Sequence, residues 1–283
     1  IPTPGAVMEC TKLLYEYLGD LIVLDVGGAT TDLHSVTVES DQVARLMISP
    51  EPKAKRTVEG DLGVYVNRWK VVESIGEEKL REQCREQGFS MEHALETYRA
   101  IPKTEEEVKL VELLTREAVV KAAERHAGRL RYIYGPSGRS TVAEGKDLTQ
   151  VKYIVGTGGA LTRLPHREEI MREITRCNES GMLLLPGEHA QILVDHDYIM
   201  ASLGVLSKRY PQAAARLLEQ SLGITFPERK AEEPVPVCNK ELSRLETQRQ
   251  QREEELQRHI EECEAMGYDM SAYRENKPKA GDC

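Results

Sequence analysis

The stretch that decides the fold is Leu21-Ile22-Val23-Leu24-Asp25-Val26-Gly27-Gly28-Ala29-Thr30-Thr31-Asp32-Leu33-His34-Ser35-Val36. It holds two short runs rich in apolar and β-branched residues, separated by a pair of glycines. Runs of this kind, bounded by glycine, predict two strands joined by a tight turn. We therefore expect strands at about 21–26 and 33–39.

The turn between these strands has the residue types of a phosphate and metal site. Gly27 and Gly28 carry no Cβ, so backbone N–H groups there can approach a bound anion closely. Thr30 and Thr31 add hydroxyl donors, and Asp25 can hold a hydrated divalent cation because hard cations take oxygen ligands. The same local pattern also fits a glycine hairpin with an Asx turn, so both interpretations stay open at this point.

Composition narrows the function classes. A chain of 283 residues is one large domain or two small ones. Its net charge of −9 argues against a nucleic-acid surface, which needs a basic patch. No apolar run approaches the roughly 18 residues of a membrane span, and the first residues lack the pattern of a signal peptide. The 6 cysteines are far apart, which predicts free thiols in a reducing, cytoplasmic compartment.

The flanking segments predict helices and one more strand. Residues 6–18 have helical spacing, and a third strand is expected at about 43–48, followed by a basic loop at 53–56. Residues 73–128 read as helical throughout, with a capping box from Thr104 to Glu107. His126, near the end of this region, is expected to be structural and favourably placed against the helix dipole. The region predicts a helical insertion, about 64–128, on a sheet domain.

A second glycine cluster follows a predicted strand at about 151–155. Gly156, Gly158 and Gly159 form a turn before a short helix, and such turns at strand ends are where α/β sheets bind nucleotides. Without Cβ atoms, Gly158 and Gly159 let a flat base or ribose lie against the backbone. The cluster is not a P-loop, because no Gly-Lys-Ser/Thr follows it. Residues 130–134 predict a further strand, and 135–149 a loop.

The remainder of the chain predicts helices and then a tail. Helices are expected at 167–177, 197–210 and 213–222, with Gly204 permitting close packing. A proline-rich linker follows, then a charged helix and, from 267, a tail. We divide the chain into a nucleotide-binding lobe at 1–225 and a linker, helix and tail at 226–283.

The two glycine motifs together resemble the phosphate and adenosine motifs of the actin, sugar kinase and heat-shock chaperone ATPase superfamily. They occur in the right order, about 130 residues apart. Over residues 1–225 the chain looks most like the MutL family associated with coenzyme-B12-dependent glutamate mutase, which is unrelated to the mismatch-repair protein of that name. Residues 24–32, 55–63 and 155–162 carry this resemblance.

The resemblance implies an α/β, ribonuclease-H-like lobe of the actin type, with a mixed sheet and flanking helices, that binds ATP and Mg²⁺. It implies that Asp25 is catalytic and binds the metal together with Asp32. The nucleotide would be held by Gly27, Gly28, Ala29, Thr30, Thr31, Glu59, Gly60, Asp61, Gly156, Gly158 and Gly159. Among these, Glu59, Gly60 and Asp61 are expected to open a helix at 64–72 beside the nucleotide.

The superfamily also has an N-terminal lobe with its own Asp-x-Gly-x-Thr motif, and none precedes Asp25. We therefore expect a C-terminal lobe that binds nucleotide weakly and hydrolyses it poorly by itself. By association, the family implies a chaperone-like ATPase that reactivates or matures a cobalamin-dependent aminomutase, its protein partner. Two alternatives are a small-molecule kinase of the same fold and a non-catalytic structural or filament module. Homodimer formation is left open.

Overall fold

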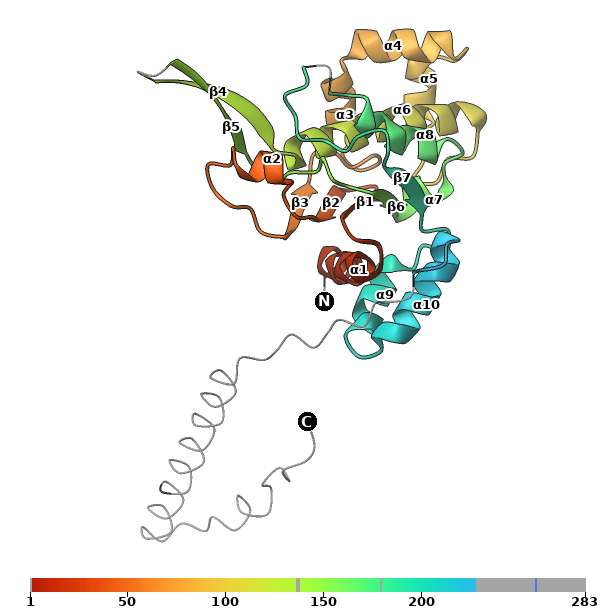
Figure 1. Ribbon diagram of the computed structural model, residues 1–283. Helices are drawn as coiled ribbons and strands as arrows, with labels where there is room; N and C mark the ends of the chain where they lie inside the picture. The colour runs from red at the N-terminus through yellow and green to blue at the C-terminus, as the bar shows by residue number, and fades with distance from the viewer. Residues whose placement is uncertain (1, 136–137, 179, 228–257, 259–283) are drawn as a thin grey trace. The chain divides into compact units, whose positions relative to one another are not determined.

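The computed structural model describes residues 2–135, 138–178, 180–227 and 258, and its centre is a five-stranded mixed sheet in the order β3-β2-β1-β6-β7 (Figure 1). The first three strands along the chain pair antiparallel, whereas β6 runs parallel to β1 and β7 parallel to β6. The expected mixed sheet with flanking helices is therefore confirmed. The strands are β1 (Leu21–Val26), β2 (Thr31–Val36), β3 (Ala54–Glu59), β6 (Tyr153–Thr157) and β7 (Gln191–Val194).

Strand β1 is the centre of the sheet and is covered on both faces. Leu21 and Val23 belong to the core on one face, and Ile22 and Leu24 to the core on the other. Successive side chains of a strand point to opposite faces, so an unbroken apolar run specifies a strand that is buried on both sides. The carboxyl end of β1 is the point at which this run is interrupted, by Asp25.

One face of the sheet is covered by α1 (Thr3–Leu18), α9 (Met200–Ser207) and α10 (Pro211–Leu222), as Figure 1 shows. A Cβ built on Gly204 would lie 1.8 Å from the carbonyl oxygen of Ala6. The absence of a side chain at Gly204 therefore lets α9 cross α1 with the backbones in contact, and the predicted close packing is confirmed.

The other face carries the helical insertion and two later helices. Its longest element, α6, begins at the predicted capping box, in which Thr104 accepts from the Glu107 N–H and Glu107 reaches back to the Thr104 N–H. The inward face of α6 forms the middle of the larger core. The helices are α3 (Arg68–Ile75), α4 (Glu77–Glu86), α5 (Met91–Glu96), α6 (Glu105–His126), α7 (Gly158–Arg163) and α8 (Arg167–Arg172), the last continued by the 3-10 turn η1 (Glu173–Thr175).

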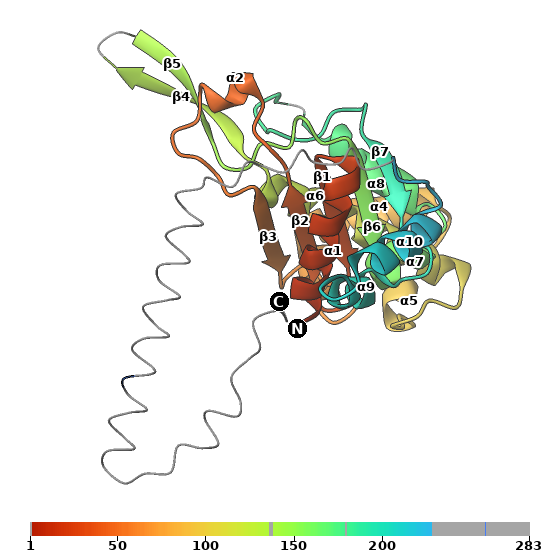
Figure 2. The ribbon, with the colours of Figure 1, turned by 60° about the horizontal axis from the view of Figure 1, so that its bottom comes forward.

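A two-stranded hairpin, β4 (Arg129–Gly135) with β5 (Gly138–Glu144), projects from the body in both Figure 1 and Figure 2. The prediction of a loop at 135–149 was wrong for β5. Most of this hairpin is exposed on both faces, so it lacks the apolar alternation that marks a half-buried strand.

The strand predicted at 43–48 was also wrong, because this segment begins with the short helix α2 (Asp41–Ala44). The side chain of Ser40 accepts from the Val43 N–H and caps that helix. The third strand is instead β3, and most of the segment predicted as a basic loop lies on it: Lys55 pairs with Ser35, and Arg56 with His34, whereas Lys53 precedes the strand. As an edge strand with polar side chains, β3 shows no apolar pattern in the sequence.

Several predicted boundaries shift. Strand β2 begins at Thr31 rather than at 33, and the helix predicted at 197–210 is the shorter α9. The predicted proline-rich linker, charged helix and tail lie outside the described residues apart from 226–227 and Arg258, so that part of the domain division stays a prediction. Among the described helices, none is both long and apolar enough to cross a membrane.

His126, the last residue of α6, is buried and hydrogen-bonded. Its Nδ1 lies 2.9 Å from Thr57 Oγ1 and its Nε2 lies 2.8 Å from Ser35 Oγ. Burial, with some contribution from the nearby Lys55, lowers the pKa of His126 to about 3. The structural role is confirmed, and His126 lies in the last turn of α6 as expected. Its lowered pKa means that a charged ring is not needed for this role near pH 7.

The pH dependence of stability checks this neutral state. Folding depresses the pKa of His126, so its favourable contribution is complete above about pH 6.5 and is lost as the pH falls towards 3. We expect His126→Gln to be about 1–2 kcal/mol less stable at pH 7, because Thr57 and Ser35 lose a partner. That gap should narrow by about 2 kcal/mol at pH 5, since only the wild-type unfolded chain then takes up this proton. Urea unfolding at both pH values measures it, and an unchanged gap would contradict a neutral His126.

Candidate functional site at the carboxyl edge of the sheet

The turn that joins β1 to β2 directs its carbonyl groups into the protein. The N–H of Gly27 donates to Thr30 O at 2.9 Å and closes the turn. Gly27 O accepts from the Val64 N–H at 3.2 Å, and Gly28 O accepts from the Tyr65 N–H at 2.9 Å. The loop that follows β3 thus wraps around the turn and fixes which way its peptide groups face.

Three consecutive N–H groups of the same turn are free donors in the described part of the chain. Those of Gly28, Ala29 and Thr30 have no acceptor among the described residues. Asn67 holds the arrangement by donating to Ala29 O at 2.8 Å and to Gly60 O at 2.7 Å. Consecutive N–H groups that face one way form a concavity suited to an anion.

The two predicted metal ligands face each other across the hairpin. Asp25 and Asp32 are directly paired in the β1–β2 register, which places both carboxylates on one face of the sheet. Asp32 Oδ2 accepts from Thr30 Oγ1 at 3.5 Å, whereas Asp32 Oδ1 is buried and has no partner among the described residues. Among the described residues, no group of three or more His, Cys, Asp or Glu side chains lies close enough together to hold a metal ion.

Burial raises the pKa values of both carboxyls. Burial is the largest cause of the rise at Asp25, with Asp32 and Asp195 adding repulsion, and its pKa reaches about 6. Burial also raises the pKa of Asp32, although the Thr30 hydroxyl and Arg56 oppose the rise. Carboxylates held in this way gain from a cation, because a bound positive charge relieves both the repulsion and the lost hydration.

The second glycine corner touches the first. Asp25 is paired with Thr157 across β1 and β6, so both strands end at the same edge of the sheet. A Cβ built on Gly158 would lie 2.5 Å from Asp25 Oδ1 and 2.6 Å from the backbone of Val26. Gly158 also has φ of +85°, and the adjacent Gly159 is exposed with open space around it. The two motifs are therefore neighbours in space.

Two predicted ligand residues are placed differently. Gly156 lies inside β6, where Met171 Sδ occupies the space that its side chain would take, at 2.5 Å from a built Cβ. The hydroxyl of Thr31 is buried and donates to Leu62 O at 2.8 Å, so it joins the hairpin to the following loop. Both residues are therefore buried and contribute to packing and hydrogen bonding inside the protein, beneath the carboxyl edge of the sheet.

The Glu-Gly-Asp segment does not open a helix, and that expectation was wrong. Glu59 ends β3, Gly60 and Asp61 follow in a turn, and the next helix, α3, begins at Arg68. Both acids bind Arg125 of α6, Glu59 at 2.6 Å and Asp61 through two contacts of 2.8 and 2.9 Å. The Glu59–Asp61 segment thus connects the loop that wraps the β1–β2 turn to the last turn of α6.

Asp195 belongs to the same edge and was not predicted. It follows β7 and accepts from Thr157 Oγ1 at 2.8 Å, from Ser221 Oγ at 2.6 Å and from the Met200 N–H at 3.0 Å. Asp195 therefore fixes Thr157 beside Asp25 and caps the start of α9. A carboxylate directly after an apolar strand, as at Asp25, was the signal in the sequence.

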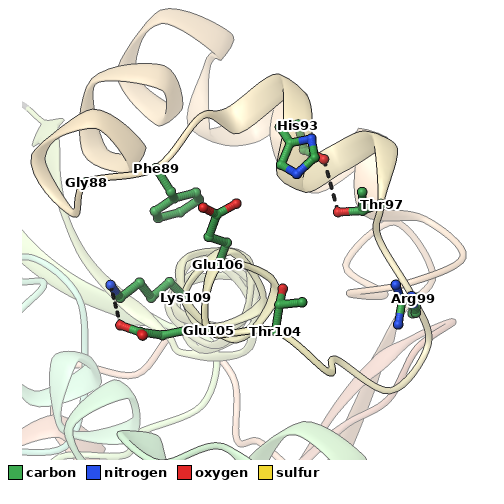
Figure 3. A pocket seen from close by; sticks show the side chains of 9 residues that line it. All are labelled: Gly88, Phe89, His93, Thr97, Arg99, Thr104, Glu105, Glu106 and Lys109. Atoms are coloured by element: carbon green, nitrogen blue, oxygen red, sulfur yellow. Dashed lines mark hydrogen bonds and ion pairs between the residues drawn. The ribbon is translucent and has the colours of Figure 1, made fainter.

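A hollow of about 460 Å³ in the helical insertion is a separate feature (Figure 3). Side chains from α6, including Glu106, face those of α5 and of the segment before it, including Phe89. Acidic and basic residues are mixed along its wall, and none of the catalytic, nucleotide-binding or metal-binding residues predicted from the sequence lines it. It is therefore distinct from the carboxyl edge.

Fold and edge together define a mixed α/β domain, flanked by helices, whose central strands end in an acidic edge bounded by two glycine corners. A family described as "MutL protein" matches residues 1–222. "Protein MutL" of Clostridium tetanomorphum is 35% identical over 234 residues, which are 78% of this chain and 50% of that protein. The chain belongs to the MutL family, and it spans about half the length of this curated relative.

Proposed function

We propose that this chain is the nucleotide-binding lobe of a chaperone-like ATPase that reactivates or matures a cobalamin-dependent aminomutase such as glutamate mutase. The observation that carries the proposal is the contact between the Gly158 corner and Asp25. Two glycine motifs separated by about 130 residues meet at one edge, as a single nucleotide between them requires.

The sheet topology supports a lobe of the actin type. Three antiparallel strands are followed by two strands parallel to the first, in the order β3-β2-β1-β6-β7. This order is the one we would expect of the ribonuclease-H-like lobe that the family resemblance implies. In such a sheet, ligands bind beyond the carboxyl ends of the strands. Asp25 and Gly158 both lie at that end.

Each residue of the edge has a role in this proposal. The N–H groups of Gly28, Ala29 and Thr30 donate to phosphate oxygens, and Gly158 and Gly159 leave room for the ribose and base. Asp25 orients the attacking water or binds the metal through water, and Thr157 stays beside it because Asp195 holds the Thr157 hydroxyl. Positioning and charge stabilisation then supply most of the catalysis, as in other phosphoryl transfers.

The pair of Asp25 and Asp32 suits Mg²⁺, which does not need a full set of protein ligands. Mg²⁺ is commonly held by one or two carboxylates, with water and substrate phosphates as the other ligands. Asp25 and the unpartnered Asp32 Oδ1 supply that number. When bound, Mg²⁺ would offset the negative charge that develops on the phosphates.

The proposed partner comes from the family. The MutL family is associated with glutamate mutase, and a lobe whose closure follows nucleotide state can act on a protein substrate through that motion. A small-molecule kinase would need an acceptor pocket beside the nucleotide, and ATP consumption that rises with one sugar or acid would indicate it. ATP-driven polymer scattering would indicate a filament module.

Nucleotide titration of Gly159→Val tests the site. Because Gly159 is exposed and its built Cβ meets nothing within 4 Å, valine should leave the fold intact and fill the space meant for the nucleotide. We expect the affinity for Mg-ATP to fall at least about tenfold, which corresponds to about 1.4 kcal/mol. Calorimetric titration measures the affinity, and thermal unfolding without nucleotide checks the fold.

Gly135→Val is the matched control. Gly135 also has open space around a built Cβ, but it lies at the end of β4 in the projecting hairpin. Its Mg-ATP affinity should equal that of the wild type. Equal affinity in Gly159→Val as well would remove the base-binding corner from the site, and a wild-type chain that binds no nucleotide would contradict the proposal.

A further inference from the structure

We propose that the β4–β5 hairpin is the surface on which this chain docks an acidic face of its protein partner. The inference rests on the proposed function for the identity of that partner, the cobalamin-dependent mutase. It is carried by the exposure, the incomplete pairing, the anchoring and the charge of the hairpin.

The hairpin exposes large apolar side chains on both of its faces. Tyr132 is 47% exposed, Ile133 51% and Tyr134 80%. Neighbours along a strand point to opposite faces, so the two tyrosines lie on one face and Ile133 on the other. Figures 1 and 2 show this ribbon projecting from the body, with no described element packed over its outer half. A partner that embraces the ribbon would cover both faces at once.

The backbone of the hairpin is also incompletely paired. Its outer edges meet other described segments near the base, where Arg129 bridges to Leu183 and Ala143 to Met47. Beyond those bridges, the described residues provide no third strand for either edge. A two-stranded ribbon has little stability of its own in water, and packing against another surface stabilises it.

The base of the hairpin is held firmly. A Cβ on Gly128 would lie 2.6 Å from the carbonyl carbon of Gly145, so the two strand ends touch there. The fully buried Lys146 donates to Pro52 O at 2.8 Å and to Thr37 O at 3.1 Å. The ribbon therefore leaves the body in a defined direction.

The hairpin also continues directly from the helix that reaches the glycine edge. Arg125, in the last turn of α6, binds Glu59 and Asp61 of the loop that wraps the β1–β2 turn. Strand β4 begins four residues later, at Arg129. The C-terminal turn of α6 therefore contacts the loop beside the glycine edge and leads directly into the hairpin. A partner bound to the hairpin and a ligand bound at the edge would both affect this turn.

Charge indicates the chemistry of the partner. Arg129, Arg131, Arg139 and Glu144 are the charged residues of 129–144, so the hairpin is positive on a chain whose net charge is −9. Arg139 lies over the Tyr132 ring at 4.4 Å, and arginine with tyrosine is typical of residues that dominate interfaces. Complementarity then favours an acidic partner surface, whereas two copies of this ribbon would repel each other.

Binding to purified cobalamin-dependent glutamate mutase tests the inference. The double variant Tyr132→Ser, Tyr134→Ser removes both rings from one face of the ribbon, and its affinity should fall at least about thirtyfold. The matched control is Tyr210→Ser, since Tyr210 is 52% exposed but lies at the start of α10. Arg139→Glu should weaken binding more at low salt than at high salt, because it reverses a charge without breaking the ion pair of Arg131 with Glu144. Thermal unfolding confirms that each variant folds.

The outcomes separate the two proposals. Loss of binding in the double variant with an unchanged Tyr210→Ser supports the hairpin as the docking surface. Unchanged binding in the double variant overturns this inference and leaves the proposed function standing. A wild-type chain that fails to bind the mutase, with and without Mg-ATP, overturns the proposed function and this inference with it. Sedimentation that shows a wild-type dimer and a monomeric double variant assigns the ribbon to a second copy and also overturns it.

Discussion

Gly204→Ala is expected to lose about 3 kcal/mol or more of the free energy of unfolding. The new Cβ would lie 1.8 Å from Ala6 O and 2.6 Å from Ala6 C, so α1 and α9 must separate. The carbonyl of Ala6 is held within α1 and cannot rotate away. Separation loosens the core between these helices and the sheet, which includes Val23 of β1. For a domain stabilised by about 5–15 kcal/mol, this is a large share.

The sign of this effect is informative, because helix propensity alone predicts the opposite. Alanine is better than glycine in a helix interior by about 1 kcal/mol. Gly159→Ala is the matched control, since Gly159 is also helical and its built Cβ meets nothing within 4 Å. That variant should be as stable as the wild type or slightly more stable. Denaturant unfolding measures both, and equal stability of Gly204→Ala and wild type would contradict the close crossing.

Apolar runs and glycines predicted the centre of this fold. The strand at 21–26 and the helix-packing role of Gly204 follow from local pattern, because burial on both faces and a close backbone contact each leave a sequence signal. Strand β3 left no such sequence signal, because it is an edge strand whose side chains, including Lys55 and Arg56, are largely polar. The exposed β5 was missed for a similar reason.

The segment predicted as a strand at 43–48 begins with a helix because a capping serine precedes it. Ser40 accepts from the Val43 N–H, and the helix covers only Asp41–Ala44, whereas Met47 forms an isolated bridge with Ala143. The resulting helix, α2, packs its Val43 against the base of the hairpin, at Ala143.

The edge was predictable in part for a chemical reason. Asp25 and the two glycine corners stand out because a carboxylate and glycines interrupt otherwise apolar strands. The contact that brings Gly158 against Asp25 depends on β1 and β6 being parallel neighbours, which no local pattern states. Likewise, the Glu59–Arg125 and Asp61–Arg125 pairs depend on where α6 ends, and sequence alone assigned those acids to a helix start.

Asp25→Asn is expected to change function and stability in opposite directions. Removing the carboxylate should lower the Mg²⁺-dependent part of the ATP affinity at least about tenfold, because one of the two carboxylates that we propose as metal ligands is lost. Without metal at pH 7, the variant should be more stable by about 1–3 kcal/mol, because folding raises the pKa of Asp25 from 3.8 to about 6. Asparagine carries no charge, so it avoids the repulsion from Asp32 and Asp195.

The pH dependence separates this explanation from a general packing effect. A carboxyl whose pKa is raised by folding contributes favourably at low pH, and that contribution is lost as the pH rises through the folded value of about 6. The stability advantage of Asp25→Asn should therefore shrink by about 1 kcal/mol between pH 7 and pH 5. The control Asp41→Asn, which replaces an exposed aspartate on α2, should show neither effect.

Mg-ATP should raise the melting temperature of the wild type and of Asp41→Asn but hardly that of Asp25→Asn, since only a ligand that binds the folded state stabilises it. Equal Mg-ATP stabilisation of all three chains would remove Asp25 from the site.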